Sequence, residues 1–166
     1  MIRKAKQSEI IQLMALTQAC AKKMEAEGIF QWNEEYPNKA AFKNDEDRGE
    51  LYVLCVNEAI VGCITISTRK DDEYNEIDWL TPDDNNFYVH RLAIHPDAQH
   101  QGYAKSLMDF AEKIAREHDA LSVRLDTFSR NKRNQKFYEN RAYQRLGDVY
   151  FPRQTQFPFH CYELVL

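Results

Sequence analysis

The stretch from residue 87 to residue 127 constrains the fold more than any other part of this sequence. An apolar run over 87–94 predicts a strand, and a second apolar run over 121–127 predicts another. Between them the sequence predicts an amphipathic helix over 102–118, because apolar residues recur there at helical spacing: Leu107, Phe110, Ala111, Ile114 and Ala115. A strand, a helix and a second strand in this order are typical of an α/β fold, in which helices pack on a sheet.

The remainder of the chain extends this pattern. Further strands are predicted over 2–5, 51–56, 60–66, 143–150 and 159–166, and further helices over 8–27, 38–45 and 131–140. Asn57, Glu58 and Ala59 join two strands as a hairpin, whereas the polar, acidic residues 69–86 predict a loop. The predicted fold class is therefore α/β, with a mixed central sheet flanked by helices. A length of 166 residues favours a single domain, residues 1–166, since domains commonly contain about 100 to 200 residues.

Charge and composition exclude several classes of protein. With 22 basic and 26 acidic residues the net charge is −4, which is the wrong sign for a dedicated nucleic-acid binder. No apolar run approaches the roughly 18 residues of a membrane helix, and residues 1–6 lead into polar sequence rather than a signal peptide. We therefore expect a cytoplasmic protein that binds neither nucleic acid nor a membrane.

The cysteines suggest neither a metal site nor a redox pair. They are scattered along the chain, without a C-x-x-C motif and without histidines at zinc-finger spacing: Cys20, Cys55, Cys63 and Cys161. Two of them lie within apolar runs, so we interpret them as small buried residues in a reducing compartment. No metal is expected.

The turn between the strand at 87–94 and the helix at 102–118 is the most informative motif. A helix N-terminus offers unpaired backbone N–H groups and the positive end of the helix dipole, which together favour an anion. Gly102 has no Cβ and Ala104 has a small one, so a diphosphate could approach the main chain there. The turn is neither a P-loop nor a G-x-G-x-x-G motif, and by itself it also fits an ordinary strand-to-helix connection.

Two motifs nevertheless resemble those of one known family. Residues 92–96 followed by Gln99-His100-Gln101-Gly102-Tyr103-Ala104 resemble the Q/R-x-x-G-x-G/A motif of the GNAT superfamily of N-acetyltransferases. Asn131, Tyr138 and Ala142-Tyr143 resemble a second GNAT motif, N-x-x-A-x-x-L/F-Y-x-x-x-G-F. Two departures occur there, because Asn134 stands where Ala is common and Ala142 replaces the usual Gly.

The resemblance implies a GNAT-like sheet of about seven strands, the fourth and fifth of which splay apart to admit the pantetheine arm of acetyl-CoA. Backbone groups of Leu92, Ala93 and Ile94 would hold the arm and the thioester. The pyrophosphate would lie on amides of the turn, which comprises Gln99, His100, Gln101, Gly102, Tyr103, Ala104 and Lys105. Asn131 would bond the arm, although its position fits a helix N-cap equally well.

The resemblance also implies catalytic roles. Tyr138 resembles the family's general acid, since a phenol stays protonated at neutral pH; the alternative is aromatic packing beside Phe137. Asp126 stands at the end of the fifth strand, where some relatives carry a catalytic Glu, and could accept the proton of the amine; the alternative is a structural acceptor. Glu163 and His90 are weaker candidates for the base, and His90 fits a partly buried structural histidine better.

Three further segments have two readings each. The basic cluster of Arg130, Lys132, Arg133 and Lys136 could meet the 3′-phosphate of the cofactor or form a solvated helix face. The aromatic segment at 29–37 could line the acceptor cleft or form a hydrophobic clasp. The acidic residues between Asp71 and Asp84 could attract a cationic amine or simply aid solubility.

These observations predict an acetyl-CoA-dependent N-acetyltransferase. It would acetylate a primary amine of a small molecule or peptide by direct attack in a ternary complex, without a covalent enzyme intermediate. The alternatives are a noncatalytic CoA-binding or sensory module of the same fold and, more remotely, a nucleic-acid-associated module built on the basic cluster. The expected partners are acetyl-CoA and an amine acceptor, and a homodimer stays open. The acceptor itself cannot be inferred, because the motifs define only the donor half.

Overall fold

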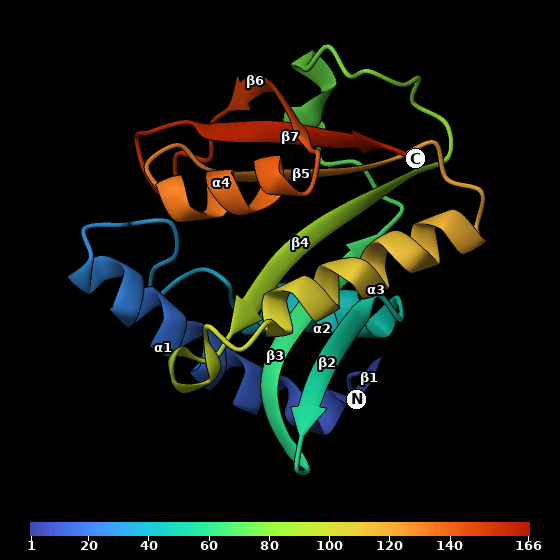
Figure 1. Cartoon of the computed structure of the whole chain (residues 1–166). Helices are drawn as coiled ribbons and strands as arrows, with labels where there is room; N and C mark the ends of the chain where they lie inside the picture. The colour runs from blue at the N-terminus through green and yellow to red at the C-terminus, as the bar shows by residue number, and fades with distance from the viewer. The chain divides into compact units, whose positions relative to one another are not determined.

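The computed structural model describes residues 1–166 (Figure 1). The chain forms two compact units, which we describe separately. The first unit contains Met1–Ile66 and His90–Ala111, and the second contains Ser67–Val89 and Glu112–Leu166. The strand β4 (Asn86–Ile94) and the helix α3 (Tyr103–Glu117) each contribute residues to both units.

The first unit combines two helices with antiparallel strands. Its further elements are β1 (Ile2–Lys4), a 3-10 helix (Gln7–Glu9), α1 (Ile10–Ala26), α2 (Lys39–Asp47), β2 (Leu51–Val56), β3 (Ala59–Ser67) and a 3-10 helix at Pro96–Ala98. β1 pairs with β2, and β2 pairs with β3. Asn57 and Glu58 form the predicted hairpin turn, and both adopt the positive φ angles that a two-residue turn requires.

Local sequence explains the helices of the first unit. α2 begins at Asn38, whose side chain accepts a hydrogen bond from the N–H of Ala41 at 2.8 Å. α1 buries one face, and the core of the unit gathers apolar side chains of α1, α2, β2 and β3, among them Leu13, Phe42, Val53 and Cys63. Gly62 of β3 lies so close to β4 that an added Cβ would come within 2.9 Å of the Ala93 carbonyl oxygen.

The second unit surrounds β5 and β7. Its elements besides parts of β4 and α3 are a 3-10 helix η2 (Asp72–Glu76), β5 (Ser122–Phe128), α4 (Lys132–Asn140), β6 (Gln144–Val149) and β7 (Phe159–Val165). β5 pairs antiparallel with β7 over its whole length, and β6 pairs with the other edge of β7 (Figure 1). Tyr138 of α4 packs on Tyr162 of β7, with ring centroids 6.2 Å apart.

The strand order is β1-β2-β3-β4-β5-β7-β6. β4 and β5 are parallel, and the other pairs described above are antiparallel, so the predicted mixed sheet of seven strands flanked by helices is confirmed. The register of β4 with β5 covers only Asn86 to Tyr88, although both strands run on beyond it. A pairing that ends after three residues fits the splayed fourth and fifth strands expected from the family resemblance.

The predicted elements agree with the structure except in two turns. The segment at 69–86, predicted as a loop, contains η2, and the turn after β4 contains the 3-10 helix at Pro96–Ala98. Both are single turns, which hydrophobic periodicity cannot resolve. The buried side chains of Tyr74 and Ile77 fix η2 within the second unit. No helix of the protein is long and apolar enough to cross a membrane.

Candidate active site

The turn between β4 and α3 is fixed by side chains at its base. His95 Nδ1 accepts a hydrogen bond from the N–H of Asp97 at 3.2 Å and so caps the 3-10 helix. The Gln99 side chain donates to the carbonyl oxygen of Ile94 at 3.1 Å and accepts from Lys23 Nζ at 2.7 Å. Gln99 therefore ties the turn to both β4 and α1, and its own N–H donates to the carbonyl oxygen of Pro96.

The N–H groups that follow Gln99 have no partner. From His100 to Lys105 no main-chain N–H donates a hydrogen bond within the protein, because these residues precede or form the first turn of α3. His100 and Gly102 adopt φ angles of 62° and 81°, and a Cβ at Gly102 would meet nothing within 4 Å. The turn is thus an open row of donors at the positive end of a helix dipole, which favours an anion.

The last residues of β4 precede this turn. Ala93 and Ile94 are buried, whereas Leu92 is only partly buried. The carbonyl oxygen of Ile94 already accepts from Cys20 Sγ and from Gln99. Its capacity to hold a ligand is therefore smaller than the sequence suggested.

A buried ion pair shapes β4 just before these residues. Arg91 has a φ of 51°, which is rare for a residue with a side chain and which interrupts the regular strand. Its guanidinium donates to both carboxylate oxygens of Asp45, at 2.6 and 2.7 Å, and to the hydroxyl of Tyr36 at 2.8 Å. Asp45 also accepts from Thr65 and Arg48. Two partners, Asp45 and Tyr36, thus hold the Arg91 side chain, and Thr65 and Arg48 hold Asp45 in turn.

Asn131 and Tyr138 lie in the second unit on α4. The Asn131 side chain accepts from the N–H of Asn134 at 3.1 Å, so its N-cap role is confirmed. The Tyr138 ring packs on Phe137 and Tyr143, but its hydroxyl makes no hydrogen bond within the protein. Burial, and next the charge of Asp126, raise the pKa of Tyr138, so the phenol stays protonated at neutral pH.

The turn after α4 tolerates the departure at Ala142. This residue has a φ of 71°, the left-handed conformation that glycine adopts most easily. The N–H groups of Ala142 and Tyr143 donate to the carbonyl oxygens of Glu139 and Tyr138, which closes the turn. The tight turn therefore forms in spite of the alanine.

Asp126 is the only residue of β5 that is not buried. Its Oδ2 accepts a hydrogen bond of 2.5 Å from the hydroxyl of Tyr74, a fully buried residue of η2. Asp126 therefore accepts a side-chain hydrogen bond and also retains partial exposure, as a residue that exchanges a proton with a substrate requires.

The two weaker candidates for the base have different surroundings. Glu163 is fully buried and accepts from Ser122, Thr81, Arg124 and the N–H of Leu80. Burial alone would raise the pKa of Glu163, but these hydrogen bonds outweigh it and lower the pKa. Burial, and next the charge of Arg91, lower the pKa of His90 to about 3, so this histidine is neutral.

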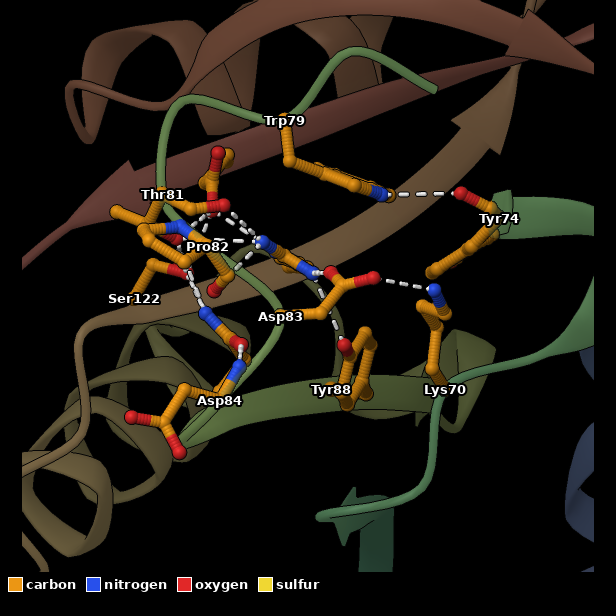
Figure 2. A network of polar contacts seen from close by, with 12 residues as sticks. Lys70, Tyr74, Trp79, Thr81, Pro82, Asp83, Asp84, Tyr88 and Ser122 are labelled. Atoms are coloured by element: carbon orange, nitrogen blue, oxygen red, sulfur yellow. Dashed lines mark hydrogen bonds and ion pairs between the residues drawn. The ribbon is translucent and has the colours of Figure 1, made fainter. Parts of the chain in front are cut away.

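Arg124 organises the polar network of the second unit. Its side chain is fully buried between Glu163 and Asp83, at 2.8 and 2.6 Å, and it lies 4.5 Å from the ring centroid of Trp79. Figure 2 shows Asp83 also facing Lys70, with which it forms an ion pair. A charged residue inside the apolar strand at 121–127 was the signal that could have revealed this network, because a buried charge requires partners.

The basic cluster, the aromatic segment at 29–37 and the acidic segment between Asp71 and Asp84 differ in exposure. Arg130 lies 3.6 Å above the Phe157 ring, and it is exposed like Lys132, Arg133 and Lys136. In the aromatic segment Trp32 joins the core and Phe30 is exposed. Most acidic residues between Asp71 and Asp84 are exposed.

All four cysteines are buried, and no group of three or more side chains of metal-ligand type comes together.

The chain thus combines a mixed sheet, which contains a short parallel β4–β5 pair, with a turn of unpaired N–H groups before α3. The sequence matches the acetyltransferase (GNAT) family over residues 13–143. The chain therefore belongs to the GNAT family of N-acetyltransferases.

The chain is also similar to individual proteins, in sequence to the first below and in fold to the two solved structures. The chain is 29% identical over 111 residues to an uncharacterized N-acetyltransferase of Lactobacillus delbrueckii subsp. lactis, a match covering 64% of this chain and 61% of the relative. An acetyltransferase of the GNAT family from Streptococcus agalactiae has a similar structure, with a TM-score of 0.84, 23% identity and coverage of 100% and 95%. The PaiA N-acetyltransferase of Thermoplasma acidophilum, solved in complex with coenzyme A, has a TM-score of 0.74, 20% identity and coverage of 100% and 98%.

Proposed function

We propose that this protein transfers an acetyl group from acetyl-CoA to a primary amine of a small molecule or peptide. The observation that carries the proposal is the row of unpaired N–H groups from His100 to Lys105. This row contains the positive φ angles of His100 and Gly102 and includes the first residues of α3, at the positive end of the helix dipole. A diphosphate satisfies such donors better than any neutral ligand does. The solved complex of a GNAT relative with coenzyme A supports the same class of ligand.

The first unit would bind the donor. The turn would hold the pyrophosphate, and main-chain groups of Leu92 and Ala93 would hold the pantetheine arm, with less help from the carbonyl oxygen of Ile94. The family resemblance implies that Asn131 also bonds this arm, in addition to capping α4. Residues Lys132, Arg133 and Lys136 are exposed and would offer cations to the 3′-phosphate.

The second unit would move protons. The amine nitrogen attacks the carbonyl carbon of the thioester, a C–N bond forms, and the C–S bond breaks. The departing sulfur takes the proton of the Tyr138 hydroxyl, which has no other partner. The amine gives up its proton to Asp126, directly or through water. Solvent then restores the proton of Tyr138 and removes that of Asp126, so the reaction needs no covalent intermediate on the protein.

The acceptor would be a cationic amine. Exposed carboxylates gather in the segment before β4, where Asp72, Glu73, Glu76, Asp78 and Asp84 are all exposed. Such a field attracts protonated amines and weakens as salt screens it. An arriving ammonium loses one proton to solvent before its nitrogen can attack, and the nitrogen loses a second proton to Asp126 as the amide forms.

A panel of acceptors tests the proposal. Thiol release from acetyl-CoA is followed with polyamines, amino acids, aminoglycosides and peptide N-termini, each at low and at high salt. We expect turnover with cationic amines and a kcat/KM that falls as salt rises. Reaction with neutral or anionic acceptors only, without salt dependence, would leave the acidic segment as a solubilising surface. Binding of CoA without thiol release from any mixture would favour the noncatalytic module instead.

A further inference from the structure

A hydrogen bond joins Tyr74 to Asp126, the proposed base. Tyr74 belongs to the segment at 69–86, which the sequence predicted to be a loop. Tyr74 is 0% exposed although charged and polar residues surround it in the sequence. Its hydroxyl lies 2.5 Å from Asp126 Oδ2, a distance in the range of a hydrogen bond from an O–H donor to a charged carboxylate. Burial, and next the charge of Asp126, raise the pKa of Tyr74 well above its ordinary value, so the hydroxyl remains the donor.

Tyr74 is held in place by two aromatic neighbours. The indole N–H of Trp79 donates to the carbonyl oxygen of Tyr74 at 3.0 Å (Figure 2). The centroids of the two rings lie 5.2 Å apart. The ring of Tyr88, on β4, lies 5.9 Å from that of Tyr74. The Arg124 guanidinium lies 4.5 Å from the ring centroid of Trp79 and so also contacts this aromatic group.

The segment that follows Tyr74, from Leu80 to Asp83, is anchored by Glu163 and Arg124. Glu163 accepts hydrogen bonds from the N–H of Leu80 and the hydroxyl of Thr81. Arg124 donates to the carbonyl oxygen of Thr81 at 2.7 Å and forms an ion pair with Asp83. Because β5 and β7 supply these anchors, the position of the Tyr74 hydroxyl is fixed relative to the strand that carries Asp126.

The titratable groups around Asp126 stay protonated, so Asp126 is the charged acceptor of the hydrogen bond from Tyr74. Cys161, its register partner on β7, has its pKa raised by burial and next by the charge of Asp126. Tyr138 of α4 has its pKa raised as well, so all three neighbouring donors stay protonated near neutral pH. Asp71 and Asp148 are the other carboxylates whose charges act on Cys161.

We propose that Tyr74 is a positioning residue, which orients the Asp126 carboxylate to accept the proton of the acceptor amine. The proposal rests on the proposed function, because it assigns Asp126 the role of base. A hydroxyl held by buried aromatic rings restricts the rotation of the carboxylate and stabilises its charged form. Tyr74 itself would touch neither substrate nor cofactor and would act through Asp126.

The test compares Tyr74→Phe with Tyr88→Phe. Both changes remove one buried hydroxyl from the same aromatic group, but the Tyr88 hydroxyl accepts from Arg124 and does not contact Asp126. The acceptor identified by the panel is used to record kcat/KM against pH for both variants, the wild type and Asp126→Asn. Because Tyr74→Phe loses a hydrogen bond to a charged group, we expect the acid limb of its kcat/KM profile to move up by about one to two pH units. Near neutral pH its kcat/KM is expected to fall about tenfold or more.

Each result decides the proposal. A shifted acid limb in Tyr74→Phe, with Tyr88→Phe at the wild-type position, supports it. A wild-type profile in Tyr74→Phe, while Asp126→Asn loses activity, overturns the role of Tyr74 but leaves the proposed function intact. Wild-type activity in Asp126→Asn removes the base and the positioning role together. Absence of turnover with every amine contradicts the proposed function itself.

A spectroscopic measurement covers the case in which Tyr74→Phe does not fold. Proton NMR of the wild type can follow the hydroxyl proton of Tyr74, which a hydrogen bond to a carboxylate moves downfield. We expect its chemical shift to change over the same pH range as the acid limb of kcat/KM. A hydroxyl signal that is constant across that limb would overturn the positioning role.

Discussion

The turn at 100–105 and the surroundings of Asp126 are built from different chemical groups. The turn offers main-chain N–H groups, and its shape depends on φ angles and on the missing Cβ of Gly102. The Asp126 region offers side chains from η2, α4 and β7, and its shape depends on buried contacts such as that of Tyr74. The first should therefore tolerate most changes of side chain, whereas the second should be sensitive to the loss of a single hydroxyl.

The largest effect is expected in the side-chain region. Tyr138→Phe keeps the ring that packs on Phe137 and Tyr143 but removes the unpaired hydroxyl. Turnover should fall by the roughly 10² to 10⁴ expected of a general acid, with little change in CoA affinity. Steady-state kinetics and calorimetry with CoA measure the two quantities. Full activity in the variant would assign Tyr138 to packing alone.

Removing the hub of the polar network should reduce the stability of the second unit. Arg124→Met leaves Glu163 buried without its cation and frees the segment that holds Trp79. We expect the free energy of unfolding to fall by about 3 to 5 kcal/mol, as is usual when one partner of a buried ion pair is lost. Urea denaturation measures this loss. A change below about 1 kcal/mol would mean that the hydroxyl and amide donors around Glu163 suffice without Arg124.

The turn should be sensitive at Gly102. Gly102→Val adds a branched side chain in the open space above the N–H groups, and we expect CoA affinity to fall at least about tenfold, which corresponds to about 1.4 kcal/mol.

Gly28→Val is the matched control for this change. Gly28 also belongs to the first unit, has a φ of 77° and has nothing within 4 Å of an added Cβ, but it lies at the end of α1. Both variants carry the same backbone strain, so both should lose similar stability in thermal unfolding. Equal CoA affinity of the two variants, measured by calorimetry, would show that the turn does not hold the diphosphate.

The smallest effect is expected at Ala142. Its φ of 71° strains an alanine but not a glycine, so Ala142→Gly should stabilise the turn after α4. The gain is partly offset by the greater freedom of glycine in the unfolded chain, and we expect a net gain of about 0.5 kcal/mol in urea denaturation. A loss of stability would mean that the methyl group of Ala142 packs favourably enough to outweigh the strain.

The turn could be predicted from the sequence because it is local. Strand, turn and helix follow one another, and Gly102 stands where a left-handed conformation is needed. The hairpin at Asn57 and Glu58 and the cap at Asn131 were predictable for the same reason, since each depends on residues only a few positions apart. Most strands also coincide with apolar runs within one or two residues.

The surroundings of Asp126 could not be predicted in the same way. Tyr74 lies 52 positions before its partner, within an acidic stretch without hydrophobic periodicity, so nothing in the sequence marks it as buried. Arg124 did carry a signal, because a charge within an apolar strand requires a partner. Yet the sequence could not tell that this partner would be Glu163 rather than another carboxylate. Contacts between distant segments are set by tertiary packing, which short-range patterns do not encode.

The most direct test of the account follows the acetyl group itself. The wild type is mixed with limiting acetyl-CoA and an amine from the acceptor panel, and thiol released, acetylated amine formed and acetyl bound to the protein are measured together by mass spectrometry. Direct transfer predicts equal amounts of thiol and acetylated amine, with no acetyl on the protein at any time. Thiol release without an acetylated amine, or an acetylated protein that forms before the product, would contradict transfer by direct attack.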